Sequence, residues 1–171
     1  MNDVLAEPAY QYPTHLKPVM NRAERKELVE ACLARLGREY FDTIAFSGIS
    51  GSSIGFILAQ LMDKEIISVR QPGVERRAGS QYNEEGYRHA LRYVVVDDLI
   101  STGTTVARVI RGVRKIAPQA ELIGVLVYYN RVKFIQPPTS FDDENVWQWK
   151  SIINTLREQD FAESQGKNPE S

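Results

Sequence analysis

Two adjacent carboxylates directly follow an apolar run, and a turn rich in hydroxyl groups comes soon after them. The run covers residues 94–96, the carboxylates belong to Asp97 and Asp98, and the turn covers residues 101–105. Carboxylates accept hydrogen bonds from neighbouring sugar hydroxyls. Backbone N–H groups and hydroxyls at the positive end of a helix bind phosphate. This order of residues therefore indicates a binding site for a sugar phosphate.

Either aspartate alone would more often be a turn or helix-cap residue, because Asp is favoured at both places. That reading does not account for a pair that follows a fully apolar strand and precedes a Ser-Thr-Gly-Thr-Thr turn. The complete pattern therefore favours a functional site. Within it, Gly103 is expected to leave room for the phosphate, so that a bulky side chain there would block the pocket.

A second stretch of small residues follows another short apolar strand, which is predicted at residues 43–46. It could bind an anion through backbone N–H groups, since small residues allow a close approach. It lacks the lysine of a P-loop and the full glycine pattern of a dinucleotide fold. Taken alone, it could equally be a plain turn between a strand and a helix. Its residues are Ser47, Gly48, Ile49, Ser50 and Gly51.

Strands and helices alternate along the chain, and this order predicts the fold. Unbroken apolar strands indicate a parallel sheet covered on both faces. The expected fold is an open, doubly wound, mainly parallel α/β sheet with helices on both faces. Ligands bind beyond the carboxyl ends of such strands, so the two polar stretches are expected to meet at one crevice. Strands are predicted at 43–46, 66–69, 92–96 and 121–129, and helices at 21–37, 54–62, 104–116 and from the Trp pair to about 157.

Length and composition indicate one domain over residues 1–157, followed by a polar tail at 158–171 that is expected to be disordered. The formal net charge of the 171 residues is −1, so no basic field favours nucleic acid or an anionic membrane. The single Cys32 allows no internal disulfide and suits the cytoplasm. No apolar segment has the length to span a bilayer, and the two histidines, far apart in sequence, indicate no metal site.

Residues 94–105 resemble the motif with which type I phosphoribosyltransferases bind phosphoribosyl diphosphate (PRPP), and the likeness covers most of residues 41–130. The resemblance implies transfer of the phosphoribosyl group to a nitrogenous base, with Mg²⁺ as cofactor and no dedicated protein cage for the metal. It implies that Asp97 and Asp98 are catalytic residues that bind the ribose hydroxyls, and that the stretch at 47–52 binds the diphosphate. It assigns the 5-phosphate to Ser101, Thr102, Gly103, Thr104 and Thr105.

Residues 70–91 resemble the mobile lid of this family. Arg70 follows a strand at a place where relatives often have a basic residue facing the diphosphate, and Arg76 and Arg77 add further charge. Cations there would neutralise the departing diphosphate. The alternative is a solvated loop or hairpin whose arginines have no such role.

The acceptor base is predicted less directly. Tyr129 and Arg131 lie in a stretch loosely similar to one in orotate enzymes, whereas Trp147 resembles a tryptophan that covers the base in 6-oxopurine enzymes. The tryptophan could also be an ordinary core or surface residue. Ser101 stands where hypoxanthine/guanine-type enzymes have an aspartate, and the lid lacks the Lys- and His-rich pattern of orotate enzymes. A purine is slightly favoured, and a hood over the base is expected from residues 1–20, 134–157 or both.

Two other classes of function remain open at this point. The chain could bind PRPP or a nucleotide without turnover, as a regulator, because a fold does not force catalysis. It could also be a nucleotide-dependent kinase or synthetase, although the P-loop lysine is missing. The expected partners are PRPP and a nucleobase, and analogy with the family implies a homodimer.

Overall fold

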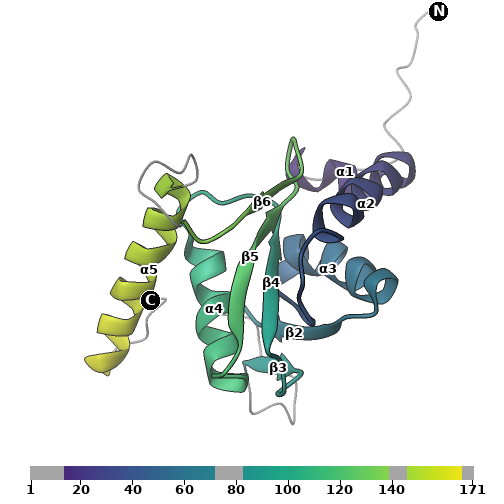
Figure 1. Cartoon of the computed structure of the whole chain (residues 1–171). Helices are drawn as coiled ribbons and strands as arrows, with labels where there is room; N and C mark the ends of the chain where they lie inside the picture. The colour runs from purple at the N-terminus through teal and green to yellow at the C-terminus, as the bar shows by residue number, and fades with distance from the viewer. Residues whose placement is uncertain (1–13, 72–82, 139–145, 167–171) are drawn as a thin grey trace, which may run out of the picture.

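A six-stranded sheet forms the centre of the molecule, with the strand order β3-β2-β1-β4-β5-β6 (Figure 1). The structure, a computed structural model, describes residues 14–71, 83–138 and 146–166. The four central strands are parallel, and both edge strands are antiparallel to their neighbours. This confirms the predicted mainly parallel sheet. The strands are β1 (Thr43–Ser47), β2 (Glu65–Val69), β3 (Glu84–Gly86), β4 (Arg92–Asp97), β5 (Glu121–Val127) and β6 (Lys133–Ile135).

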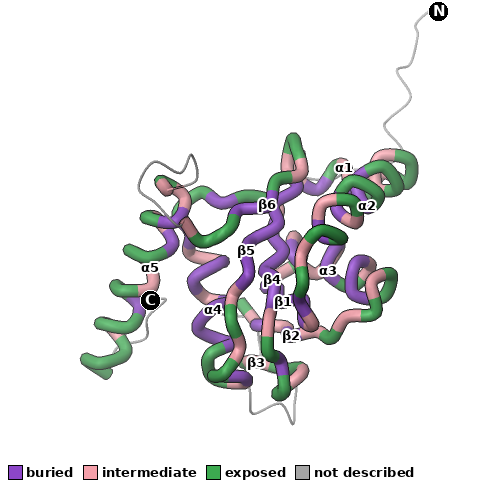
Figure 2. Tube along the Cα trace, in the orientation of Figure 1, coloured by how far each residue is buried: buried purple, intermediate pink, exposed green. Residues whose placement is uncertain are grey.

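Helices cover both faces of the sheet, as predicted. Buried side chains of α2 and α3 pack in one cluster with Phe46 and Val94 of the sheet. Buried side chains of α4 and α5 pack on the opposite face with Ala45 and Val95. Figure 2 shows the resulting buried centre and the exposed outer sides of the helices. The helical elements are η1 (Thr14–Leu16), α1 (Lys17–Met20), α2 (Arg22–Leu36), α3 (Gly48–Met62), α4 (Thr104–Ile116) and α5 (Val146–Ser164).

Strands β1, β4 and β5 are mostly apolar because both of their faces are covered. All five residues of β1 are buried, and so are the last five residues of both β4 and β5. Side chains alternate between the two faces of a strand, so both alternating sets must be apolar when both faces are covered. Polar groups on these strands can reach solvent only at the strand ends.

The chain passes from β1 into α3 without a loop, which corrects the loop predicted at residues 47–52. Ser47 ends the strand, and Gly48 begins the helix with a φ of +67°. Glycine adopts this left-handed conformation without steric cost, so the chain can change direction within a single residue. The small residues after Gly48 therefore form the first turn of a helix.

Both edge strands were missed by the sequence analysis. β3 and β6 are only three residues long and carry too few residues to show an alternating pattern. β3 pairs with β2 within the segment predicted as a lid, and β6 pairs with β5 just before the Pro-Pro pair. Their positions follow from pairing with a neighbouring strand, which a local sequence pattern does not show.

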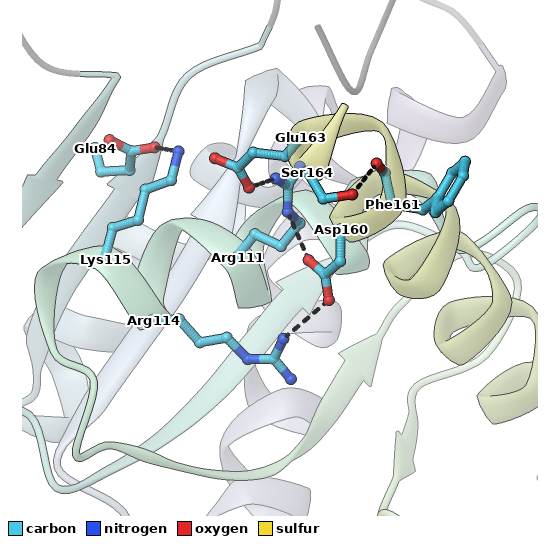
Figure 3. A network of polar contacts seen from close by, with 8 residues as sticks. All are labelled: Glu84, Arg111, Arg114, Lys115, Asp160, Phe161, Glu163 and Ser164. Carbon is cyan, nitrogen blue, oxygen red and sulfur yellow. Dashed lines mark hydrogen bonds and ion pairs between the residues drawn. The ribbon is translucent and has the colours of Figure 1, made fainter. Parts of the chain in front are cut away.

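Helix α5 continues to Ser164, so the disorder predicted from Glu158 is not found in residues 158–166. Two acidic residues of this segment, Asp160 and Glu163, have partners on α4 (Figure 3). Arg111 Nε lies 3.3 Å from Asp160 Oδ1, and the Arg111 guanidinium also donates to Glu163. Gln159 is buried. The polar composition that indicated a tail is thus the composition of a docked helix, and residues 167–171 lie outside the described part.

In the described ranges, no helix combines the length and the apolar composition that crossing a membrane requires.

Removal of residues 158–171 is expected to destabilise the protein, although the sequence pattern predicted a tail without structural role. The truncation removes Gln159 and both partners of Arg111, whose side chain is 10% exposed. The carboxylates are half exposed, which limits the strength of the pairs. We therefore expect a loss of at least about 1 kcal/mol in unfolding free energy, or roughly 2–4 °C in melting temperature. Thermal denaturation of this variant beside one that ends at Gly166 measures the effect. Equal melting temperatures would show that the docked segment contributes nothing.

Candidate active site at the carboxyl ends of β1 and β4

The order of strands places a crevice between β1 and β4. These two strands are neighbours, but α3 connects β1 to β2 on one side, whereas α4 connects β4 to β5 on the other. Connections that leave in opposite directions open a space beyond the carboxyl ends of the two strands. Ser47 and Asp97, the last residues of β1 and β4, lie at this edge of the sheet.

A cavity of about 280 Å³ lies at the end of β4. It brings together all seven residues predicted to bind the ribose and the 5-phosphate, and it adds a histidine from the N-terminal segment. Their predicted roles remain predictions, but the residues share one solvent-accessible space. The lining residues are His15, Asp97, Asp98, Leu99, Ile100, Ser101, Thr102, Gly103, Thr104, Thr105 and Val106.

The two aspartates lie in different environments. Asp97 is 4% exposed, and its Oδ1 accepts a hydrogen bond of 2.9 Å from the backbone N–H of Asp98. Burial, with the neighbouring charge of Asp98 as a second cause, raises the pKa of the Asp97 carboxyl to about 7. Asp98 is half-buried, and its Oδ1 accepts the N–H of Leu99 at 2.8 Å. The pair therefore combines a carboxyl that ionises reluctantly with a more accessible carboxylate.

The backbone of Asp98 is fixed from the side of β5. Its carbonyl oxygen accepts hydrogen bonds from the N–H groups of Tyr128 and Tyr129, at 3.1 and 2.8 Å. The Tyr128 hydroxyl in turn donates to the Ser50 carbonyl at 2.7 Å. These bonds join the ends of β4 and β5 to the first turn of α3. The carboxylate pair therefore lies on a rigid support.

The turn after the carboxylates has the chemistry that an anion site needs. The Thr102 and Thr104 hydroxyl oxygens lie 2.8 Å apart, and Gly103 precedes α4 with a φ of +80°. Because a glycine occupies the N-cap, no side chain caps this helix. The Thr104 N–H donates to Thr102 Oγ1 at 3.4 Å. The next two N–H groups, of Thr105 and Val106, have no partner within the helix and can bind an anion.

Gly103 is required for a reason other than the predicted one. A Cβ atom at this position would lie 2.8 Å from the backbone nitrogen of Ile152 and 2.9 Å from its Cα atom, and both belong to α5. A side chain at Gly103 would thus collide with α5, whereas the sequence predicted that it would block the phosphate pocket.

The residues predicted to bind diphosphate lie at the junction of β1 and α3, outside the lining of the 280 Å³ cavity. Ile49 is exposed, whereas Gly51 is buried, and a Cβ there would lie 2.6 Å from the Val96 carbonyl oxygen. Close packing of α3 on β4 therefore accounts for Gly51. The buried Ser47 hydroxyl has no hydrogen-bond partner among the described residues. The Ser47 hydroxyl at this junction is therefore available to bind a ligand in the crevice.

Arg70 follows β2 and lies beside the short edge strand β3. Its guanidinium Nη2 lies 2.6 Å from Glu85 Oε1, and its backbone N–H donates to the Asn83 carbonyl. The structure therefore places it in the base of a hairpin, and it does not line the 280 Å³ cavity. Arg76 and Arg77, with half of the predicted lid, lie outside the described residues.

The three residues predicted to contact the base do not come together. Tyr129 and Arg131 line a second cavity of about 370 Å³, with Lys17, Pro18 and Glu24 among its other lining residues. One lining residue links this cavity to the carboxylate pair, because the Tyr129 N–H donates to the Asp98 carbonyl at 2.8 Å.

Trp147 lies apart from the second cavity. It is 58% exposed in the first turn of α5 and lines neither cavity. The buried member of the Trp pair is Trp149, whose indole N–H donates to the Gln136 carbonyl. Trp149 therefore contributes to the docking of α5, whereas Trp147 is largely exposed.

His15 is the residue of this site that the sequence analysis missed. Its Nε2 lies 3.8 Å from Asp98 Oδ2. The short segment that carries it is held by the buried Leu16 and Val19, and Arg25 donates to the Val19 carbonyl at 2.9 Å. The apolar spacing of Leu16 and Val19 was the available signal for an ordered segment before residue 21. Two apolar residues are too few to distinguish a short helical segment from an extended one.

Among the described residues that line the 280 Å³ cavity, Asp97 and Asp98 supply the carboxylate oxygens. Residues 14–71, 83–138 and 146–166 contain no group of three or more Asp, Glu, His or Cys side chains that could hold an ion. Asp97 and Asp98 supply hard oxygen donors at the cavity, which suit Mg²⁺ when water and substrate oxygens complete its shell.

Comparison with known proteins agrees with this geometry, although no protein-family model matches the chain. The chain is 27% identical over 136 residues to the orotate phosphoribosyltransferase of Pyrobaculum calidifontis, covering 77% of this chain and 69% of the relative. Adenine phosphoribosyltransferase from Thermoanaerobacter pseudethanolicus has a similar structure, with a TM-score of 0.52 and 23% identity over 66% of this chain and 72% of that chain. UMP synthase of Leishmania donovani gives a TM-score of 0.52 and 24% identity over 66% of this chain and 24% of that chain.

The two solved structures show the fold, and the curated relative matches the chain in sequence over 69% of its own length. These similarities agree with the resemblance to type I phosphoribosyltransferases that the motif at residues 94–105 indicated.

The stability of the protein is expected to depend on pH through Asp97. Its folded-state pKa of about 7 lies above the ordinary value of about 4. The folded chain therefore holds more protons than the unfolded chain between these values, and the free energy of unfolding falls as pH rises through this interval. We expect Asp97→Asn and the wild type to have similar stability below about pH 4, where the wild-type carboxyl is protonated in both states. The variant is expected to be the more stable near about pH 8. Denaturant unfolding without ligand tests this, and parallel pH profiles would contradict the assignment.

Proposed function

We propose that the chain transfers the 5-phosphoribosyl group of PRPP to a nitrogenous base and releases diphosphate. The observation that carries this proposal is the single cavity that joins Asp97, Asp98 and the turn at residues 101–105 at the switch point of the sheet. The proteins named above are phosphoribosyltransferases or a UMP synthase, and they give no support to a regulator that binds PRPP without turnover.

In this proposal the protein acts through positioning and electrostatics. Asp97 and Asp98 accept hydrogen bonds from the ribose hydroxyls, and the turn with the first N–H groups of α4 holds the 5-phosphate. Two fixed ends orient the ribose, so the anomeric carbon meets the base in a defined geometry. The negative pair also stabilises positive charge that develops on the ribose ring during departure of the diphosphate.

The diphosphate is assigned to the junction of β1 and α3. The buried Ser47 hydroxyl and the N–H groups of the first turn of α3 are the hydrogen-bond donors of this edge. Mg²⁺, near the carboxylate pair, would neutralise the charge of the leaving group when bound. It would keep water and substrate oxygens as most of its ligands.

The acceptor base is assigned to the second cavity, beside Tyr129 and Arg131. The N-terminal segment with Lys17 and Pro18 forms its other wall and would act as the hood. The sequence slightly favours a purine, whereas the known relative acts, by its name, on orotate. A panel of both kinds of base therefore decides the acceptor.

A diphosphate-release assay tests the activity. Purified protein with PRPP and Mg²⁺ is expected to release diphosphate with one base, or a few, from adenine, guanine, hypoxanthine, xanthine, orotate and uracil. Omission of the metal is expected to suppress the release, because the leaving group then keeps its full charge. PRPP that binds without release for any base would support the regulator. ATP binding that PRPP does not compete with would support a nucleotide-dependent enzyme.

The ribose assignment has a separate test. Asp97→Asn combined with Asp98→Asn is expected to weaken PRPP binding by about 100-fold or more, since each lost charge-assisted bond contributes about 1.5–3 kcal/mol. Isothermal calorimetry measures the affinity, and circular dichroism checks that the fold is kept. As a matched control, Asp63→Asn with Glu27→Gln changes two exposed carboxylates outside both cavities. An unchanged affinity in the first double variant would refute the assignment.

A further inference from the structure

Helix α5 lies directly behind the turn that is assigned to the 5-phosphate. Thr155 Oγ1 donates a hydrogen bond of 3.0 Å to the carbonyl oxygen of Thr102. One turn earlier on α5, the backbone of Ile152 occupies the space that a side chain at Gly103 would need. Two consecutive residues of the turn are thus in contact with one helix, from the side away from the cavity.

Interactions near both ends of α5 fix the position of this helix. At the start of the helix, Trp149 is buried and its indole donates to the Gln136 carbonyl beyond β6. Toward the end, Asp160 and Glu163 pair with Arg111 of α4 (Figure 3). Between these points, Ile152 is fully buried in the core cluster of that face of the sheet. The position of α5 relative to the turn is therefore fixed by packing that does not involve the turn itself.

The turn has few restraints of its own. Thr102 and Ser101 are exposed, and the side-chain hydrogen bonds within the turn join only Thr102 and Thr104. Gly103 at its centre has the widest backbone freedom of any residue type. Without an external contact such a turn would populate several shapes, and a ligand would have to select one of them at a cost in affinity.

We propose that α5 sets the shape of the 5-phosphate turn, with Thr155 as the positioning residue. The Thr155 hydroxyl orients the Thr102 peptide, and the Ile152 backbone restricts Gly103 to the conformation in which the N–H groups of α4 point at the anion. The inference rests on the proposed function only in that the turn binds the phosphate of a phosphorylated pentose. It does not require turnover.

The test compares affinities for ribose 5-phosphate and for PRPP in the full-length chain. Thr155→Val keeps the shape of the side chain and removes the hydroxyl. It is expected to weaken binding about 3- to 10-fold, which corresponds to one lost neutral hydrogen bond. Thr155→Ser restores a hydroxyl and is expected to bind within about 2-fold of the wild type. Ser164→Ala is the matched control, because its hydroxyl donates only to Phe161 of the same helix.

Isothermal calorimetry is run well below the melting temperature of every variant, so that lost stability alone cannot lower the affinity. Weaker binding by Thr155→Val, recovery in Thr155→Ser and no change in Ser164→Ala support the inference. Equal binding by Thr155→Val and the wild type overturns it, as does a wild type that binds neither ligand. Failure of the proposed reaction would appear separately, as binding of PRPP without diphosphate release.

Discussion

The helices on both faces of the sheet impose the constraint on which the site depends. A strand covered on both faces disfavours polar side chains within its length, so the interiors of β1, β4 and β5 are mostly apolar. Polar chemistry is therefore confined to the strand ends, and parallel pairing brings these ends to one edge. This arrangement explains the position of Asp97 at the end of β4. It is the first polar position after a buried run, and it remains close enough to the core for its pKa to rise.

The same constraint explains what the sequence could predict. The apolar runs, the capping Asn21 and the turn before α4 are local signals, and each leads to an element observed in the structure. The carboxylate pair and the turn are only a few residues apart, so their meeting at one cavity also follows from local order. The likeness to PRPP-binding enzymes depends on this local stretch.

What the sequence could not predict depends on distant contacts. β3 and β6 form by pairing with β2 and β5. The part of α5 beyond Glu158 is held on α4, where Arg111 pairs with Asp160. His15 lies at the site because the neighbouring Leu16 and Val19 are buried and hold the segment in place. The grouping of Tyr129 with Arg131, and the separation of Trp147 from both, follow from the β5–β6 turn and the start of α5. A pattern within one segment contains none of this information.

The contact between α5 and the turn also has a consequence for synthesis of the chain. Thr155 and Thr102 are 53 residues apart, and every strand of the sheet precedes α5 along the chain. The N-terminal part of a nascent chain folds first, so the sheet can assemble on the ribosome before α5 has emerged. If α5 sets the shape of the turn, a chain released before residue 155 would have the carboxylate pair on its sheet, but its phosphate-binding turn would lack a fixed conformation. Premature termination would then yield a protein that competes weakly, or not at all, for the cell's phosphorylated sugars.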